Sequence, residues 1–241
     1  MKNDIPYLGQ KYVECIESTV DALEPNILLY GSTVYGVVSS DLDISMIVKD
    51  YSPDDYERIK EKTIRFQREH NMDLDEEVPF SSKLIYRTDD VRDMIENTPF
   101  KKENGIYRIT PVEKTSTFLS SKEMKYRLLL NILTTRSLLL RGDSQKINDY
   151  RQQAWDTLTR VILSYNSISE MDIDRFLNLL SRDEKNNLEG EMFLGYKSNI
   201  PQKKVDLRED ADMALQRLVA KGKAHKNSNG IYVFDEDWIH E

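Results

Sequence analysis

The sequence predicts an α+β fold: a small mixed β-sheet covered by helices, then a helical region, then a helix followed by a β-hairpin. Three observations indicate this order. Helical and strand patterns alternate in the first part of the chain, broad apolar helical faces follow from about residue 113, and two short strands flank Asn227–Gly230. The 241 residues can build one large hydrophobic core or two small ones.

The front of the chain carries the signals of two strands and a helix before them. Apolar residues at helical spacing predict a helix over 8–23. The apolar run 26–30 leads into a Gly-Ser turn and predicts a buried strand. Residues 41–48 alternate at period two, with Leu42 and Ile44 on one face, and predict the next strand.

A helix and further strand signals complete the expected sheet. Ser52-Pro53 marks the start of a charged amphipathic helix over 52–71. Residues 72–79 predict a strand that Pro79 ends, and 81–87 continue the sheet beyond that break.

Long helical patterns and a different tail follow. We expect one long helix over 120–143, a second over 147–166 and a third over 170–187. Within 210–238 an amphipathic helix, a glycine and two short strands follow one another, as in a winged-helix-like tail. The corresponding domain boundaries are 1–112, 113–182 and 183–241.

The turn "LLLRGDSQ" is interpreted as the C-terminus of the first of these long helices. Arg141 lies in the last turn and Gly142 just beyond it, which is the usual order at such an end. In the alternative interpretation, Arg141 or Asp143 reaches into a binding pocket.

The composition is that of a globular protein, with 39% apolar and 32% charged residues. The formal net charge of −8 gives no sign of nucleic-acid binding and suits partners that are cations or metal-escorted anions. Cys15 is the single cysteine, so no disulfide within the chain and no cysteine zinc cluster can form. Since the sequence shows neither a signal peptide nor an apolar run of membrane-spanning length, we expect a cytoplasmic protein without membrane contact.

Two aspartates in the second expected strand are the strongest chemical signal. Asp41 and Asp43 are two residues apart, so both carboxylates point to the same side. If the two strands are neighbours, this pair faces Gly31, where the backbone can approach a ligand, and Ser32, whose hydroxyl can bind a phosphate oxygen. Magnesium prefers carboxylate oxygens together with substrate phosphates, so the pattern fits phosphoryl chemistry on a nucleoside triphosphate.

This spacing resembles the signature of the DNA polymerase β-like nucleotidyltransferase superfamily. Gly31-Ser32, an eight-residue gap with Gly36, and then Asp41-Leu42-Asp43-Ile44 match that pattern. The resemblance implies that the two aspartates bind two Mg²⁺ ions, that Gly31 and Ser32 hold the triphosphate, and that a third carboxylate comes from a later strand.

The third carboxylate is expected between residues 72 and 79. Asp73, Asp75 and Glu77 share one face of the strand expected there. We favour Asp75 as the third metal ligand because it is central in that strand, with Glu77 next and Asp73 after. Glu77 can instead orient a metal-bound water or act as the general base. Lys83 follows closely and can contact a phosphate or pair with these acids.

The resemblance therefore implies a transferase that moves a nucleoside monophosphate, with AMP favoured, from a triphosphate to a hydroxyl of a small-molecule acceptor. A small domain followed by helices is similar to stand-alone antibiotic nucleotidyltransferases, and the acidic balance favours a cationic acceptor. One alternative is a nucleotidyltransferase of the toxin–antitoxin type that modifies protein or RNA. Another is a nucleotide-sensing DNA-binding regulator without catalysis.

The basic residues near the tail bear on the regulator alternative. Lys221, Lys223, His225 and Lys226 form a patch around the expected hairpin. We interpret this patch as a lid beside the acceptor or a solubilising surface, in preference to a nucleic-acid contact.

Overall fold

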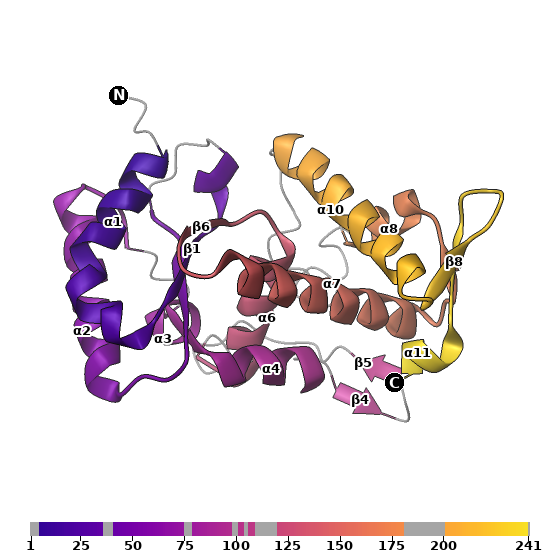
Figure 1. The fold of residues 1–241 in the computed structure, drawn as a ribbon, viewed down its shortest axis with the longest axis horizontal. Helices are drawn as coiled ribbons and strands as arrows, with labels where there is room; N and C mark the ends of the chain where they lie inside the picture. The colour runs from indigo at the N-terminus through magenta and orange to yellow at the C-terminus, as the bar shows by residue number, and fades with distance from the viewer. Residues whose placement is uncertain are drawn as a thin grey trace.

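The computed structural model describes residues 5–35, 41–74, 79–97, 101–103, 106–108, 120–180 and 201–240. Within these ranges the chain is α+β, with a four-stranded mixed sheet, a two-stranded hairpin and a three-stranded sheet. Figure 1 shows the larger sheet between a pair of helices on one side and a group of helices that leads into the tail on the other. None of the helices in these ranges is both long and apolar enough to cross a membrane.

The four-stranded sheet has the order β3-β2-β1-β6. Its members are β1 (Asn26–Leu29), β2 (Ile44–Val48), β3 (Ile85–Arg87) and β6 (Leu138–Arg141). Strand β1 is antiparallel to both of its neighbours, whereas β2 and β3 are parallel. Every residue of β1 and β2 is buried, because helices cover both faces of the sheet. The first two strands are neighbours, which meets the condition on which the expected site depends.

One face of the sheet is covered by α1 (Ile5–Val20), which a 3₁₀ turn extends to Leu23, and by α2 (Pro53–Glu69). The two helices meet at a hydrogen bond of 2.8 Å between the hydroxyls of Tyr12 and Thr63. Ser52 caps α2 through a capping box with Asp55, as its sequence signal predicts. Both of the helices expected in this part of the chain are confirmed.

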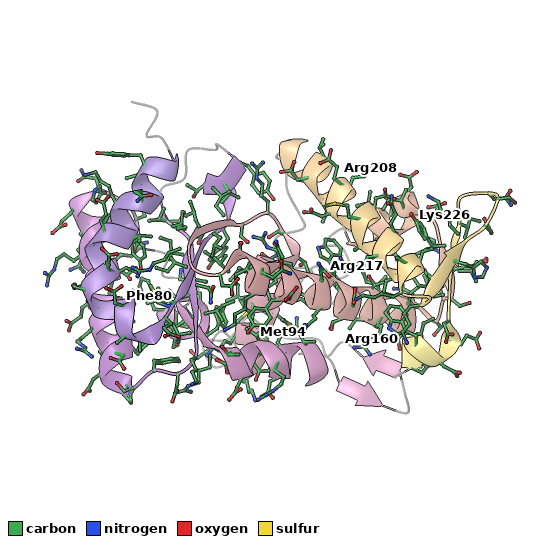
Figure 2. All side chains as sticks on the ribbon, in the orientation of Figure 1. Phe80, Met94, Arg160, Arg208, Arg217 and Lys226 are labelled. Carbon is green, nitrogen blue, oxygen red and sulfur yellow. The ribbon has the colours of Figure 1, made fainter. Side chains whose placement is uncertain are left out.

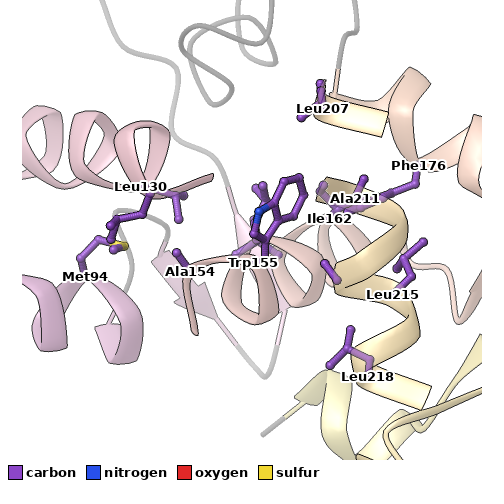
Figure 3. Packing of buried hydrophobic residues seen from close by; sticks show 14 of the residues in the cluster. Met94, Leu130, Ala154, Trp155, Ile162, Phe176, Leu207, Ala211, Leu215 and Leu218 are labelled. Carbon is purple, nitrogen blue, oxygen red and sulfur yellow. The ribbon is translucent and has the colours of Figure 1, made fainter. Parts of the chain in front are cut away.

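The other face is covered by α4 (Thr88–Asn97), α6 (Lys122–Thr134) and α7 (Ser144–Asn166). Their buried side chains belong to one hydrophobic cluster that includes strands of the sheet and also the tail. In Figure 3 this cluster runs from Met94 and Leu130 past Trp155 to Ala211 and Leu215. The sheet and the tail therefore share a continuous core along α7.

The tail is a helical pair closed by a small sheet of order β7-β9-β8. The order of the elements in the chain is β7 (Glu170–Met171), α8 (Ile173–Leu180), α10 (Pro201–Ala220), β8 (Ala224–Lys226), β9 (Tyr232–Phe234) and α11 (Glu236–His240). The predicted helix and hairpin are confirmed, and β7 adds a strand that the sequence did not indicate. The remaining elements are η2 (Ser32–Tyr35), α3 (Phe80–Lys83), β4 (Lys101–Glu103) and β5 (Ile106–Arg108).

The segment expected to form one long helix instead contains a helix and a strand. Helix α6 ends at Thr134, where the hydroxyl of Thr134 bonds to the Leu130 carbonyl, and Leu138–Arg141 then forms β6. The prediction was wrong because an apolar run of this length fits either a helix or a buried strand. The free edge of β1 provides the hydrogen-bonding partner that decides for the strand.

The helix-end interpretation of Arg141, Gly142 and Asp143 was therefore wrong as well. Arg141 ends β6 and forms ion pairs with Glu17 at 3.0 Å and Asp21 at 2.7 Å. Asp143 begins α7 as its N-cap and accepts hydrogen bonds from the backbone of the first turn. Neither side chain is thus directed to an acceptor pocket.

Two further strand boundaries and one helix start differ from expectation. Strand β2 begins at Ile44, so Asp41 and Asp43 lie in the segment that leads into it. Residues 72–74 have no regular structure and 75–78 lie outside the described residues, while the sheet gains β3 from the run 81–87. The third helix begins at Ile173, after Glu170–Met171 has formed β7.

Candidate active site

The Gly-Ser turn and the aspartate segment meet at one edge of the four-stranded sheet. The backbone N–H of Tyr30 donates a hydrogen bond of 3.0 Å to the carbonyl of Asp43, which extends the pairing of β1 and β2 by one step. Gly31 follows with φ of 78°, in the left-handed region that favours glycine. A Cβ built on Gly31 would lie 1.9 Å from Oδ2 of Asp43. The turn therefore meets this carboxylate in direct contact.

The alternation expected of the aspartate segment continues outside the strand itself. Leu42 and Ile44 are buried against α1 and α2, while Asp41 and Asp43 are half-buried. The side-chain amide of Gln67 on α2 donates a hydrogen bond of 3.3 Å to the Leu42 carbonyl. These apolar and polar anchors hold the segment so that the carboxylate of Asp43 lies on the side away from the α1–α2 layer, against Gly31.

Lys83 lies at the same edge of the sheet, beyond β2. The register pairs Met46 with Ile85, which places Lys83 level with the start of β2. Its carbonyl accepts a hydrogen bond from the buried hydroxyl of Ser45. Its ammonium lies 5.5 Å from the ring centroid of Phe80, which Figure 2 labels. Only 7% of Lys83 is exposed, so its side chain is packed inside the protein next to Phe80.

The structure describes the other predicted site residues only in part. Ser32 begins the 3₁₀ helix η2 directly after Gly31, but its side chain is not described. Asp75 and Glu77 lie outside the described residues, and Asp73 is exposed. Among the residues that the structure describes, no group of three or more His, Cys, Asp or Glu is placed to hold a metal ion. The choice of the third carboxylate therefore stays a prediction.

A pocket of about 370 Å³ opens beside this edge, between the α6–β6 connection, α7 and α10. Its lining includes Arg136, Arg151, Trp155, Asp210 and Met213. None of these residues was predicted to belong to the site, because they come from three separate segments. The sole local signal is the helical spacing that puts Asp210 and Met213 on one face of α10.

The strand register connects the pocket to the Gly-Ser turn. Leu138 of β6 pairs with Leu29 of β1, so the residues just before Leu138 lie beside those just after Leu29. Ser137 of the pocket is thus a neighbour of the segment that leads to Gly31, on the side opposite Asp43. Adjacent strands are about 4.8 Å apart, so the pocket wall and the aspartates flank the turn within a few strand spacings.

Tyr35 joins the turn to the pocket side. Burial raises the pKa of its hydroxyl to about 12, an effect opposed by a hydrogen bond from the backbone of Arg136 and reinforced by the charges of Asp206 and Asp210. The side chain at the end of η2 thus lies close to the start of α10. Tyr30 and Tyr86, by contrast, belong to the hydrophobic core.

Ion pairs fix the walls of the pocket. Arg136 binds Asp206 of α10 at 3.0 Å, and Arg217 of α10 binds Asp156 of α7 at 2.7 Å. Figure 2 shows where Arg217 projects from α10. Arg151 of α7 donates two hydrogen bonds to Ser137, of 2.6 Å to the carbonyl and 2.8 Å to the hydroxyl. Helix α10 is therefore held against both α7 and the loop that enters β6.

Comparisons with family models, with curated proteins and with solved structures find no match to this chain. The site thus consists of a half-buried carboxylate pair against a glycine turn, a buried lysine on one side and a polar pocket on the other. Paired carboxylates suit a hard cation, and a glycine turn with a nearby lysine suits phosphate.

Proposed function

We propose that this chain is a metal-dependent nucleotidyltransferase, which moves a nucleoside monophosphate, with AMP favoured, from a triphosphate to a hydroxyl of a small acceptor. The observation that carries the proposal is the contact between Gly31 and the carboxylate of Asp43. Partial burial of a carboxylate against the Gly31 turn costs desolvation free energy. The arrangement is useful when the turn and the carboxylate hold the same ligand.

The residues present fit magnesium. Asp41 and Asp43 offer carboxylate oxygens in half-buried positions two residues apart, and the missing side chain of Gly31 lets the carboxylate of Asp43 lie directly against the turn. Asp41 and Asp43 would hold the ions, together with Asp75 as the expected third ligand. Bound Mg²⁺ supplies neutralisation of the negative charge on the phosphates.

The chain's own groups would position the reactants. Gly31 and Ser32 would bind the β- and γ-phosphates, and Lys83 would add a positive charge on the other side of β2. The acceptor hydroxyl oxygen attacks the α-phosphorus, and the bond between the α-phosphorus and the oxygen bridging to the β-phosphate breaks. Pyrophosphate leaves with that electron pair, and the hydroxyl proton passes to a base, for which Glu77 is the sequence candidate.

The DNA-binding alternative is disfavoured by the orientation of α10. In a winged-helix unit this helix would enter the DNA groove. Here its residues Asp206, Asp210 and Arg217 face the pocket or pair with α7 and the α6–β6 loop. A helix that already contacts the rest of the protein with its polar face has that face unavailable for bases. Non-specific DNA affinity that falls steeply with salt would reopen this alternative.

The proposal is tested by thermal shift with ATP, GTP, CTP and UTP, each with and without Mg²⁺. We expect a stabilising shift with one nucleotide that needs Mg²⁺ and is lost in Asp41→Asn and Asp43→Asn. Asp54→Asn, an exposed carboxylate in the first turn of α2, makes the same charge change elsewhere and serves as the control. A shift that survives in both site variants, or no shift with any nucleotide, would contradict the proposal.

A further inference from the structure

The pocket between the α6–β6 loop, α7 and α10 contains one carboxylate that lacks a partner among the described residues. Asp210 faces this space from α10, and no described residue forms an ion pair or a hydrogen bond with its side chain. The other acids near the pocket are already used, because Asp206 binds Arg136 and Asp156 binds Arg217. Asp210 is thus the carboxylate left to meet a ligand.

Arg151 faces the same space from α7. It attracts Asp210 electrostatically, yet the two side chains do not form an ion pair within the pocket. Arg151 instead gives its hydrogen bonds to Ser137. A donor and an acceptor of opposite charge therefore border the same cavity without touching, and they leave room for a group between them.

The charges decide which ligand suits this room. An ammonium group would be attracted by Asp210 but repelled by Arg136 and Arg151. A carboxylate would be attracted by the two arginines but repelled by Asp210. A hydroxyl both donates and accepts, so it can satisfy Asp210 and a neighbouring donor at once without adding charge.

The rest of the lining suits a small ring. Trp155 and Met213 offer apolar surface, and the volume of about 370 Å³ lies near the lower end of the range of about 300–1,000 Å³ usual for small-molecule pockets. Met213 is 59% exposed at the rim, which leaves the entrance open on that side. The apolar face of a saturated ring can lie on such a wall while its hydroxyls reach the polar groups.

We infer that this pocket binds the acceptor as a neutral, hydroxyl-bearing ring of the sugar or cyclitol class, with a hydroxyl that donates a hydrogen bond to Asp210. The inference rests on the proposed transferase activity, because that activity requires an acceptor beside the Gly31 turn. It replaces the cationic acceptor that the net charge favours with a neutral one, since the arginines and carboxylates around the pocket balance one another.

Three ligands with one ring skeleton test the inference: glucose, glucosamine and glucuronate, which differ in carrying a hydroxyl, an ammonium or a carboxylate. Binding to the full chain is measured by saturation-transfer NMR. We expect glucose to bind best, and its affinity to fall by about tenfold or more in Asp210→Asn, the loss expected for a hydrogen bond to a charged acceptor. Glu209→Gln, the same charge change on the exposed neighbouring residue, should leave binding unchanged.

A second variant keeps the test informative if Asp210→Asn fails to fold. Met213→Arg changes an exposed rim residue and is expected to block glucose binding while preserving the fold. Preferred binding of glucosamine or glucuronate, equal binding of glucose to Asp210→Asn, or no binding of any of the three would overturn the inference.

Failure of the inference is distinguishable from failure of the proposed function. The Mg²⁺-dependent nucleotide shift should persist in Asp210→Asn, and glucose binding should persist in Asp43→Asn. A nucleotide shift without Asp210-dependent ring binding would remove the acceptor assignment alone. Ring binding without any nucleotide shift would contradict the proposed transferase activity and would support a sugar-binding pocket alone.

Discussion

The carboxylate of Asp43 occupies the space in which residue 31 would carry a side chain. A Cβ on Gly31 would lie 1.9 Å from Oδ2 and 2.8 Å from Cγ of Asp43, and the backbone of Gly31 has φ of 78°. Two independent constraints thus require glycine at this position, one from backbone conformation and one from the neighbouring carboxylate.

Replacing Gly31 with alanine is therefore expected to displace Asp43 and to abolish Mg²⁺-dependent nucleotide binding. The free energy of unfolding should fall by about 2 kcal/mol or more, since backbone strain of about 1–2 kcal/mol adds to the clash. Urea unfolding and thermal shift with the best nucleotide measure the two effects.

Gly222 provides the matched control for that change. Its φ is 70°, but no atom lies within 4 Å of where a Cβ would be. Gly222→Ala should cost about 1 kcal/mol from strain alone and leave nucleotide binding intact. Equal losses of stability in the two variants, with nucleotide binding retained in Gly31→Ala, would show that the contact with Asp43 is unimportant.

Asn26 is expected to contribute more to stability than the ion pairs at the other side of β6. This buried side chain accepts a hydrogen bond of 2.8 Å from the backbone of Asp143 and donates one of 3.4 Å to the carbonyl of Ile47. Asn26→Ala leaves the Asp143 N–H and the Ile47 carbonyl without this partner and should lower the free energy of unfolding by about 2 kcal/mol. Arg141→Ala removes partly exposed ion pairs and should cost less than about 1 kcal/mol. Urea unfolding decides, and the reverse ranking would refute this account of the β1–β6 edge.

Ser45 should matter for the placement of Lys83. Its hydroxyl is buried and donates to the Lys83 carbonyl, so Ser45→Ala leaves that carbonyl without this donor and should cost about 1–3 kcal/mol. Ser81→Ala, at an exposed position in the same short helix, should change stability by less than about 0.5 kcal/mol. Chemical denaturation of the two variants gives the comparison, and similar values would argue against this link between β2 and α3.

The pH dependence of stability should carry the signature of Asp210. Burial raises its pKa from 3.8 to about 6, more than the nearby positive charges lower it. The charged groups that act on it are Arg136, Arg151, Asp206 and Glu209, with the hydroxyl of Tyr35 nearby. The pKa of Asp210 is higher in the folded protein than in the unfolded chain. Protonated Asp210 therefore contributes its full stabilisation of the folded state below pH 3.8, and this contribution is lost as the pH rises through about 6.

Asp210→Asn should therefore be more stable than the wild type at about pH 8 and should lose this advantage as the pH falls to about 3.5. The difference should be on the order of 1 kcal/mol, because the side chain is partly exposed and solvent screens the effect. Unfolding midpoints at the two pH values measure it, with Glu209→Gln as the control. Parallel pH profiles for the wild type and Asp210→Asn would mean that the carboxylate is not perturbed in the folded protein.

Local signals account for the parts of the fold that the sequence predicted. The buried run at β1 and the Ser52-Pro53 start of α2 carry their own information, so both elements formed as expected. Strand β6 could not be predicted in this way, because Leu138–Arg141 fits a helix equally well until the open edge of β1 is known. The same limit applies to the site. Gly31 and Asp43 are close in sequence and predictable, while Asp210 and Arg151 meet at the pocket through tertiary packing alone.

The continuous core along α7 determines what happens when the chain is truncated before the tail. Leu207, Ala211, Leu215 and Leu218 of α10 belong to the same buried cluster as Leu28 of the sheet. A chain cut before α10 would leave the apolar side of α7 exposed to water, which favours aggregation over a smaller folded protein. The tail is thus a permanent part of the scaffold, and this chain cannot gain or lose it as a unit without losing the shared core. Changes of single residues on the pocket face of α10 remain open to it.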